Sequence, residues 1–290
     1  MNGSSLDPRI IRIDRTKHFW MKYSRGERTL QLLEDRLAEP QSHRMRNVLI
    51  IGDSNSGKTR LALRFMRRHR PQVNLSSPSV VPLLYVEATA ADENKFYNAI
   101  FEELPVYKHG QTARSDMKEI LAIRAMRDCG IRMLIIDEFH NLVKAPNQKQ
   151  NNFRRVIRSL GNQLKIPILA LGTREAFHAI SSDSHLANRF QVVSLPKWEL
   201  NGAGADEPSE YRKFLAAFER ALPFHETSDL GNDPMAAKIY ALSEGNIGEA
   251  ADLLRDAARW AVRNDDARIT EEALVECEFV PPSRRTILPD

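Results

Sequence analysis

Eight consecutive residues, Gly52 to Thr59, combine glycines, hydroxyl groups and one lysine at the spacing of a phosphate-binding loop. They fit the pattern G-x-x-x-x-G-K-[ST] at every fixed position. In such a loop, backbone N–H groups surround a polyphosphate, Lys58 reaches the terminal phosphates and the Thr59 hydroxyl binds Mg²⁺. We therefore interpret the run as an ATP site that also takes Mg²⁺. Its members are Gly52, Asp53, Ser54, Asn55, Ser56, Gly57, Lys58 and Thr59.

The residues on either side of this run have the order of strand, loop and helix that phosphate binding needs. Val48 to Ile51 is a continuous apolar run, which is typical of a strand buried on both faces of a parallel sheet. After the loop, apolar residues recur at helical spacing from Leu61 to Met66, and Pro71 ends the pattern. This order directs the positive end of a helix dipole at the phosphates. The alternative, a glycine-rich turn in another kind of αβ protein, does not require such flanks.

Two adjacent carboxylates, Asp137 and Glu138, end a second strand pattern. This pattern begins at Arg132 and continues with apolar residues up to Asp137. Ligand groups in open αβ sheets lie at the carboxyl ends of strands, so these acids are expected to face the phosphate loop. Asp137 is then a candidate for the Mg²⁺ shell, and Glu138 for orienting or deprotonating the water that attacks the γ-phosphate. Without the phosphate loop, two solvated acids at a strand end would be the better interpretation. A further apolar run, Ile166 to Leu171, leads to Thr173, a candidate sensor of the γ-phosphate.

A basic helix face follows the acidic pair after one short loop. Apolar residues recur at helical spacing from Phe153 to Leu164, and arginines occupy the opposite side. The sequence favours neither a solvated helix surface nor a surface that faces DNA. If the chain binds DNA, this segment is the best candidate. Its basic residues are Lys144, Lys149, Arg154, Arg155 and Arg158.

The chain divides by composition into four segments. Residues 1–24 form an N-terminal arm in which aromatic and basic residues alternate, and we favour packing of its aromatics over stacking on nucleic acid. Residues 25–200 contain five strand patterns separated by helices, which predicts an α/β domain with a parallel sheet. After a Gly- and Asp-containing linker, residues 209–278 show only helical patterns. Residues 279–290 are expected to be a flexible tail.

Composition and residue patterns limit the classes of protein to which the chain can belong. The 290 residues carry 42 Lys and Arg against 38 Asp and Glu, and this mild basic excess permits nucleic-acid binding without requiring it. The two cysteines, Cys129 and Cys277, have no metal-site or disulfide-framework spacing. No signal-peptide pattern and no apolar run long enough to span a membrane is present. We therefore expect a cytoplasmic protein.

Taken together, these motifs resemble those of the AAA+ class of P-loop ATPases with a helical lid. The N-K-x-D motif that reads guanine is missing, which argues against a GTPase. Within the class, the chain looks most like TniB, a family of ATP-binding transposition proteins related to TnsC and more distantly to MuB. The resemblance spans about residues 25 to 265. Its most specific stretches are N-Q-L-K-I-P-I-L-A-L-G-T, which ends at Thr173, and G-N-I-G, which begins at Gly245.

The resemblance implies an ATPase that assembles on duplex DNA as a ring or helical filament when ATP is bound. It implies recruitment and activation of a TniA-like transposase, a TniQ-like targeting factor as a further partner, and disassembly on hydrolysis. It also assigns Arg189 the role of an arginine finger in the ATP site of a neighbouring subunit. Gly248 and Glu249 stand where many AAA+ lids have a sensor arginine, which suggests a slow switch. The alternative is a nucleotide-switched protein-interaction module that does not bind DNA directly.

Overall fold

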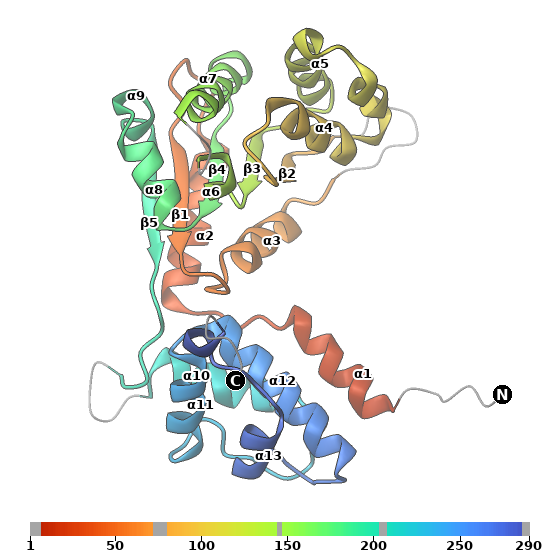
Figure 1. Cartoon of the computed structure of the whole chain (residues 1–290), viewed down its shortest axis with the longest axis vertical. Helices are drawn as coiled ribbons and strands as arrows, with labels where there is room; N and C mark the ends of the chain where they lie inside the picture. Colours follow the sequence, from red (N-terminus) through yellow and green to blue (C-terminus); the bar gives the residue numbers. More distant parts are fainter. Residues whose placement is uncertain (1–6, 72–79, 144–146, 203–207, 286–290) are drawn as a thin grey trace, which may run out of the picture. The chain divides into compact units, whose positions relative to one another are not determined.

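The structure is a computed structural model that describes residues 7–71, 80–143, 147–202 and 208–285. Contacts divide the chain into two compact units (Figure 1). One unit is Ser24–Leu195, and the other joins Met1–Tyr23 to Pro196–Asp290. We refer to them as the nucleotide-binding unit and the helical unit. Within the described ranges, none of the helices combines the length and apolar character that crossing a membrane requires.

The nucleotide-binding unit contains a five-stranded sheet with the order β2-β3-β4-β1-β5, in which every pair of neighbours is parallel. The prediction of a five-stranded parallel sheet flanked by helices is therefore confirmed. The fourth strand begins two residues later than predicted, because Pro167 has no N–H to contribute to a ladder. The strands are β1 (Asn47–Gly52), β2 (Leu83–Glu87), β3 (Met133–Asp137), β4 (Ile168–Gly172) and β5 (Phe190–Leu195).

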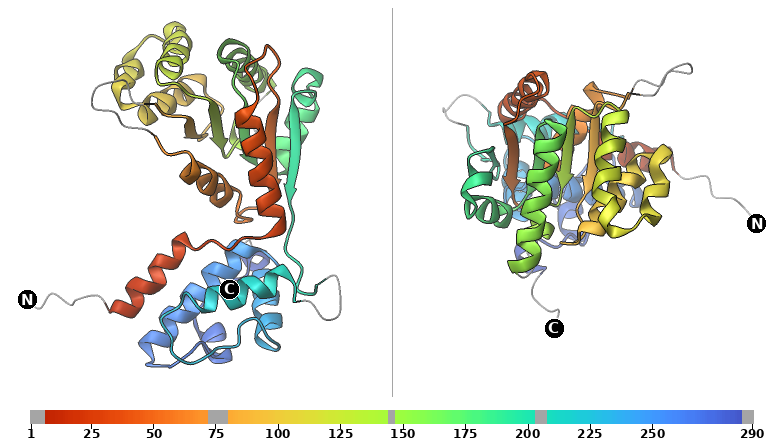
Figure 2. Two further views of the ribbon diagram at one scale, coloured as in Figure 1. Left: turned by 180° about the vertical axis from the view of Figure 1, so that it is seen from behind. Right: turned by 90° about the horizontal axis from the view of Figure 1, so that it is seen from above.

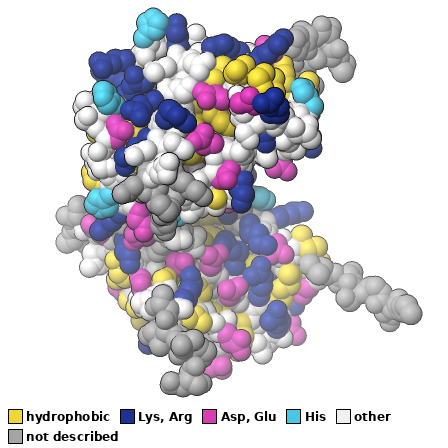
Figure 3. Space-filling view, turned by 45° about the horizontal axis from the view of Figure 1, so that its top comes forward, with side chains coloured by type: hydrophobic (Ala, Val, Ile, Leu, Met, Phe, Trp, Pro, Cys, Tyr) yellow, Lys and Arg dark blue, Asp and Glu magenta, His cyan; other side chains and the backbone are white. Residues whose placement is uncertain are grey.

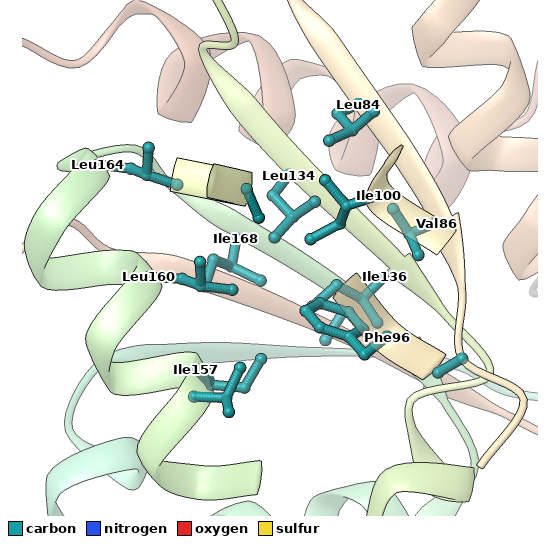
Figure 4. Packing of buried hydrophobic residues seen from close by; sticks show 14 of the residues in the cluster. Leu84, Val86, Phe96, Ile100, Leu134, Ile136, Ile157, Leu160, Leu164 and Ile168 are labelled. Carbon is teal, nitrogen blue, oxygen red and sulfur yellow. The ribbon is translucent and has the colours of Figure 1, made fainter. Parts of the chain in front are cut away.

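Helices cover both faces of this sheet. The central strands β1, β3 and β4 are largely apolar because both of their faces are buried, whereas the edge strand β5 is partly exposed. Residues two apart in β3, such as Leu134 and Ile136, face the same core as Ile157 of α7 (Figure 4). The opposite face is covered by α2 and α3 (Figure 2). The helical segments of this unit are α2 (Ser24–Ala38), α3 (Lys58–Arg68), α4 (Glu93–Glu103), η2 (Pro105–Thr112), α5 (Ser115–Asp128), α6 (His140–Val143), α7 (Asn147–Leu164), α8 (Arg174–Ser181) and α9 (Ser184–Ala187).

The helical unit includes the N-terminal segment, which the sequence suggested as a separate arm. Its first helix, α1, contacts α12 and buries Ile13 completely. Asp14 also accepts a 2.6 Å hydrogen bond from Arg259 of α12. A helix of eight residues is too short to be stable alone and is stabilised by packing, so its sequence does not show which element it packs against. The segments of this unit are α1 (Pro8–Arg15), η1 (Thr16–His18), α10 (Glu210–Glu219), α11 (Met235–Ser243), α12 (Ile247–Arg263), α13 (Glu271–Glu276) and η3 (Pro282–Arg284).

The aromatic residues of the N-terminal segment pack inside the helical unit. The ring of Phe19 lies edge-on to Phe214 and Phe218, with centroids 5.8 and 5.3 Å apart. The ring centroids of Tyr23 and Trp198 are 4.8 Å apart. These contacts favour packing over nucleic-acid stacking as the role of the aromatics, because the rings already contact other aromatic rings of the helical unit.

Residues 279–285, part of the predicted flexible tail, make specific contacts in the helical unit. Arg285 forms two hydrogen bonds with Glu249, of 3.0 and 2.5 Å, although only 6% of the Glu249 side chain is exposed. The Ser283 N–H donates to Glu244, and the guanidinium of Arg285 lies 5.5 Å from the Phe279 ring centroid. A buried carboxylate needs a compensating charge, which explains why this part of the tail is held. Residues 286–290 lie outside the described ranges.

We expect Arg285→Gln to lower the free energy of unfolding of the helical unit by about 1–2 kcal/mol. The substitution removes the guanidinium partner of the buried Glu249 carboxylate, and the partial exposure of Arg285 keeps the cost at the low end. All three tryptophans, Trp20, Trp198 and Trp260, lie in this unit, so denaturation followed by tryptophan fluorescence measures its stability. Adding Glu249→Gln to the variant removes the buried carboxylate charge and should recover most of the loss. A double variant as unstable as Arg285→Gln alone would contradict the buried-charge explanation.

Candidate nucleotide-binding site

The predicted phosphate loop joins the end of β1 to the start of α3. Gly57 has φ 92°, a left-handed conformation that glycine adopts without strain, and it immediately precedes the first residue of α3. A Cβ at Gly52 would lie 2.5 Å from the Ser56 hydroxyl and 2.8 Å from the Leu195 carbonyl oxygen. The loop therefore needs glycine at both of its fixed glycine positions, for conformation at Gly57 and for close approach at Gly52.

The loop borders a pocket of about 480 Å³. Besides the loop, three residues that follow β3 and β4 line it, and two of these were predicted from sequence. The parallel topology explains the meeting, because the carboxyl ends of these strands lie at one edge of the sheet. The lining residues are Ser54, Asn55, Ser56, Gly57, Lys58, Thr59, Arg60, Leu63, Glu138, His140 and Thr173.

Lys58 is 7% exposed, and its ammonium group donates to two backbone carbonyls of the loop. The Nζ atom lies 3.0 Å from the Gly52 oxygen and 2.7 Å from the Asp53 oxygen. Burial lowers the pKa of Lys58, while the nearby charges of Glu138 and Asp137 oppose that shift. An ammonium group has three donors, so one remains for a phosphate oxygen.

Two further features fit the loop to a phosphate and a cation. The Ser56 hydroxyl oxygen is buried and has no hydrogen-bond partner among the described residues, so it can bond to a ligand oxygen. Thr59 and Asp137 place hydroxyl and carboxylate oxygens together, the ligand type that Mg²⁺ prefers. The residues present therefore fit a nucleotide with Mg²⁺. Within the described ranges, His, Cys, Asp and Glu form no separate cluster that could hold a metal ion.

Asp137 is held by three donors and is 2% exposed. Its Oδ2 atom accepts from the Thr59 hydroxyl at 2.6 Å and from the Tyr85 hydroxyl at 2.8 Å. Its Oδ1 atom accepts from the backbone N–H of Glu138 at 2.7 Å. Burial, followed by the hydrogen bond to Asp137, raises the pKa of Tyr85 far above its usual range, so the phenol remains a donor.

Tyr85 was not among the site residues predicted from the sequence. In the ladder, Tyr85 pairs with Ile135 and Glu87 pairs with Asp137, so all four side chains share one face of the sheet. Only the register between β2 and β3, which is not a local property of either strand, brings the phenol to the carboxylate. The available signal was a tyrosine, whose hydroxyl needs a hydrogen-bond partner when buried, in a mostly apolar strand.

Glu138 follows Asp137 with φ 51°, and its side chain is 41% exposed in the pocket. Its Oε2 atom lies 3.3 Å from Nε2 of His140. In the part of the chain that the structure describes, Nδ1 of that ring is buried without a hydrogen-bond partner. Non-glycine residues with positive φ are uncommon and often lie at functional sites. The geometry places the carboxylate of Glu138 at the pocket surface, next to a histidine that the sequence analysis did not assign to the site.

Arg189 does not lie in the pocket of its own chain. It immediately precedes β5, and its backbone oxygen accepts from Asn47 at the start of β1, at 2.7 Å. The phosphate loop begins at the other end of β1, about 17 Å away along the strand. The guanidinium of Arg189 donates to Asn162 at 2.9 Å. A role for Arg189 in ATP hydrolysis therefore requires a neighbouring subunit.

The predicted DNA-facing residues differ in what they contact. Arg154 donates to the Ala179 carbonyl at 3.1 Å and to the Ser182 hydroxyl at 2.7 Å, which ties α7 to α8. Arg158 lies 3.8 Å from Asp183. Arg155 has the most exposed side chain of the three, at 70%, and lies 3.8 Å from Glu93.

Lys144 and the side chain of Lys149 lie outside the described residues. Figure 3 shows Lys and Arg side chains gathered at the upper left of the view. Because Arg154 bonds to α8 and Arg158 lies beside Asp183, the basic face predicted from sequence is partly used for internal contacts. Arg155 is the most exposed of its described arginines.

The sheet order, the loop between β1 and α3 and the acids after β3 are those of a P-loop AAA+ ATPase fold. The Orc1 protein of Aeropyrum pernix, in a structure with DNA, superposes with a TM-score of 0.70 at 19% identity, covering 94% of this chain and 70% of that one. Cdc6p of Pyrobaculum aerophilum gives 0.65 at 16% identity, over 91% and 71%. The RuvB branch-migration motor of Thermotoga maritima gives 0.53 at 17% identity, over 87% and 67%.

The chain belongs to the bacterial TniB protein family, whose model matches residues 9–200. The resemblance read from the sequence is thereby confirmed. Comparison with curated proteins gives no significant match.

Proposed function

We propose that this protein is an ATP-dependent, DNA-binding regulator of transposition. It assembles on target duplex DNA with ATP bound, recruits and activates a transposase, and leaves the DNA when ATP is hydrolysed. The observation that carries the proposal is the meeting of Glu138 and the Thr59–Asp137 pair at one phosphate loop, in a chain of the TniB family. These are the groups that hydrolysis of a nucleoside triphosphate requires.

Each residue has a role that follows from its position. The loop N–H groups and Lys58 bind the phosphates, and the Thr59 hydroxyl and Asp137 hold Mg²⁺, which neutralises phosphate charge when it is bound. Glu138 orients the attacking water and accepts its proton, because its carboxylate is exposed in the pocket. Thr173 lies in the same pocket and contacts the γ-phosphate, with its hydroxyl otherwise donated to Glu175 at 2.9 Å.

Two observations support DNA as the partner. The Orc1 protein of Aeropyrum pernix, which has the same fold, is described in complex with DNA. The chain also has a net charge of +4 and exposes Arg155 on α7. Positively charged side chains bind duplex DNA by displacing its counterions, so affinity should fall with salt concentration.

The test is binding of the purified protein to a fluorescent random-sequence duplex with ATP, with ADP and without nucleotide. We expect tight binding, and ordered oligomers in electron micrographs, only with ATP. The same preparations are assayed for ATP binding. ATP binding without DNA binding in any state would contradict the proposal and favour a switch that acts on protein alone.

Arg155→Gln should weaken duplex binding and make the slope of log K against log salt about one unit shallower, the effect of losing one phosphate contact. Arg124→Gln on α5 is the matched control, because Arg124 is also largely exposed and lies 3.7 Å from a carboxylate. Its slope should equal that of the wild type. An Arg155→Gln slope indistinguishable from both would remove this residue from the interface.

A further inference from the structure

We infer that Tyr85 is a positioning residue of the Mg²⁺ site and that it acts through the carboxylate of Asp137. The inference rests on the proposed nucleotide function and adds a residue on β2 that contacts no phosphate. Tyr85 is absent from the lining of the pocket, so any effect on the bound nucleotide must pass through Asp137.

A count of acceptor sites shows how Asp137 is fixed. A carboxylate offers about four lone-pair sites, two on each oxygen. The Thr59 and Tyr85 hydroxyls fill both sites of Oδ2, and the Glu138 N–H fills one site of Oδ1. Donors on both oxygens prevent the carboxylate from turning about its Cβ–Cγ bond. One site on Oδ1 remains for a further donor, such as a water molecule of a Mg²⁺ shell.

The orientation of Asp137 decides what Thr59 can do. A hydroxyl has one proton and two lone pairs, and Thr59 gives its proton to Asp137. Both lone pairs are then available to a cation. If Asp137 turned away, the proton of Thr59 would have to find another acceptor, and the hydroxyl would lose its orientation. Tyr85 opposes that turn because it is anchored in β2, on the neighbouring strand of the ladder.

A residue that hydrogen-bonds to a metal ligand is a partner of this kind. Its substitution typically lowers metal affinity 10–100-fold. Tyr85→Phe keeps the ring and removes only the hydroxyl, so the packing of β2 is preserved. We expect the variant to bind Mg²⁺ with nucleotide about 10-fold more weakly, at the low end of this range, since Thr59 and the Glu138 N–H still hold Asp137.

The measurement is the affinity for a fluorescent ATP analogue in saturating Mg²⁺ and in EDTA, for the full chain. The ratio of the two dissociation constants gives the contribution of Mg²⁺, independently of hydrolysis. We expect Tyr85→Phe to reduce this ratio about 10-fold and to leave the EDTA value unchanged. Tyr107→Phe is the matched control, because it removes a hydroxyl that donates to Asp128 at 2.7 Å, away from the pocket.

The outcomes separate the inference from the proposed function. A Tyr85→Phe ratio equal to that of the wild type, or affinity reduced equally in Mg²⁺ and in EDTA, would overturn the positioning role. A wild-type protein that shows no Mg²⁺-dependent binding would instead overturn the proposed nucleotide site. Circular dichroism of each variant verifies that the fold is intact.

Discussion

Glu138→Gln is expected to bind ATP with nearly unchanged affinity and to hydrolyse it about 10²–10⁴ times more slowly. The amide has the shape of the carboxylate but accepts no proton from the attacking water. Phosphate contacts are retained, because Lys58 and the loop N–H groups are not altered. The substitution therefore separates binding from turnover, which are measured by equilibrium titration and by phosphate release.

The proposed function gives this variant a second expected property. If hydrolysis drives disassembly, DNA-bound oligomers of Glu138→Gln should persist after a chase with unlabelled duplex, whereas wild-type oligomers dissociate. Glu102→Gln is the matched control, since Glu102 is an exposed residue of α4 that does not line the pocket. Rapid turnover by Glu138→Gln would remove Glu138 from its catalytic role. Slow turnover with normal dissociation would contradict the proposal that hydrolysis drives disassembly.

The groups at the phosphate loop were predictable because each is encoded by a few adjacent residues. The loop, the apolar run of β1 and the acid pair after β3 are local patterns, and parallel topology places their functional ends at one edge. Tyr85 and His140 were not assigned because their positions at the site depend on contacts across strands and on local backbone conformation. A tyrosine in a strand usually signals packing, and only the β2–β3 register shows that its hydroxyl meets Asp137.

Contacts between residues distant in sequence were not predictable from the local sequence pattern in either unit. Ile13 and Arg285 lie near opposite ends of the chain, and both contact α12. Helical periodicity showed that α7 has a basic face. It did not show that the guanidinium of Arg154 donates hydrogen bonds to Ala179 and Ser182. Periodicity identifies which residues share a face, whereas the neighbour of that face is a property of the tertiary fold.

Arg189→Ala should retain ATP binding and reduce hydrolysis about 10³-fold in the assembled oligomer, the low end of the range for an arginine finger. The large effect is expected because a guanidinium neutralises charge that develops on the transferred phosphoryl group. The residue lies at the far end of β1 from its own phosphate loop, so the affected site must belong to a neighbouring subunit. Asn162→Ala removes the hydrogen-bond partner of Arg189 and serves as a control for local disruption, with hydrolysis close to wild type.

Mixing subunits tests the shared site directly. Lys58→Ala subunits lack ATP binding but present an intact Arg189, whereas Arg189→Ala subunits have an intact pocket. Neither should hydrolyse ATP alone, and a mixture should regain activity because some interfaces combine the intact pocket with the intact arginine. Lys58→Ala/Arg189→Ala subunits added in the same proportion should restore nothing. If the first mixture gains no activity although the subunits assemble together, Arg189 does not act across the interface.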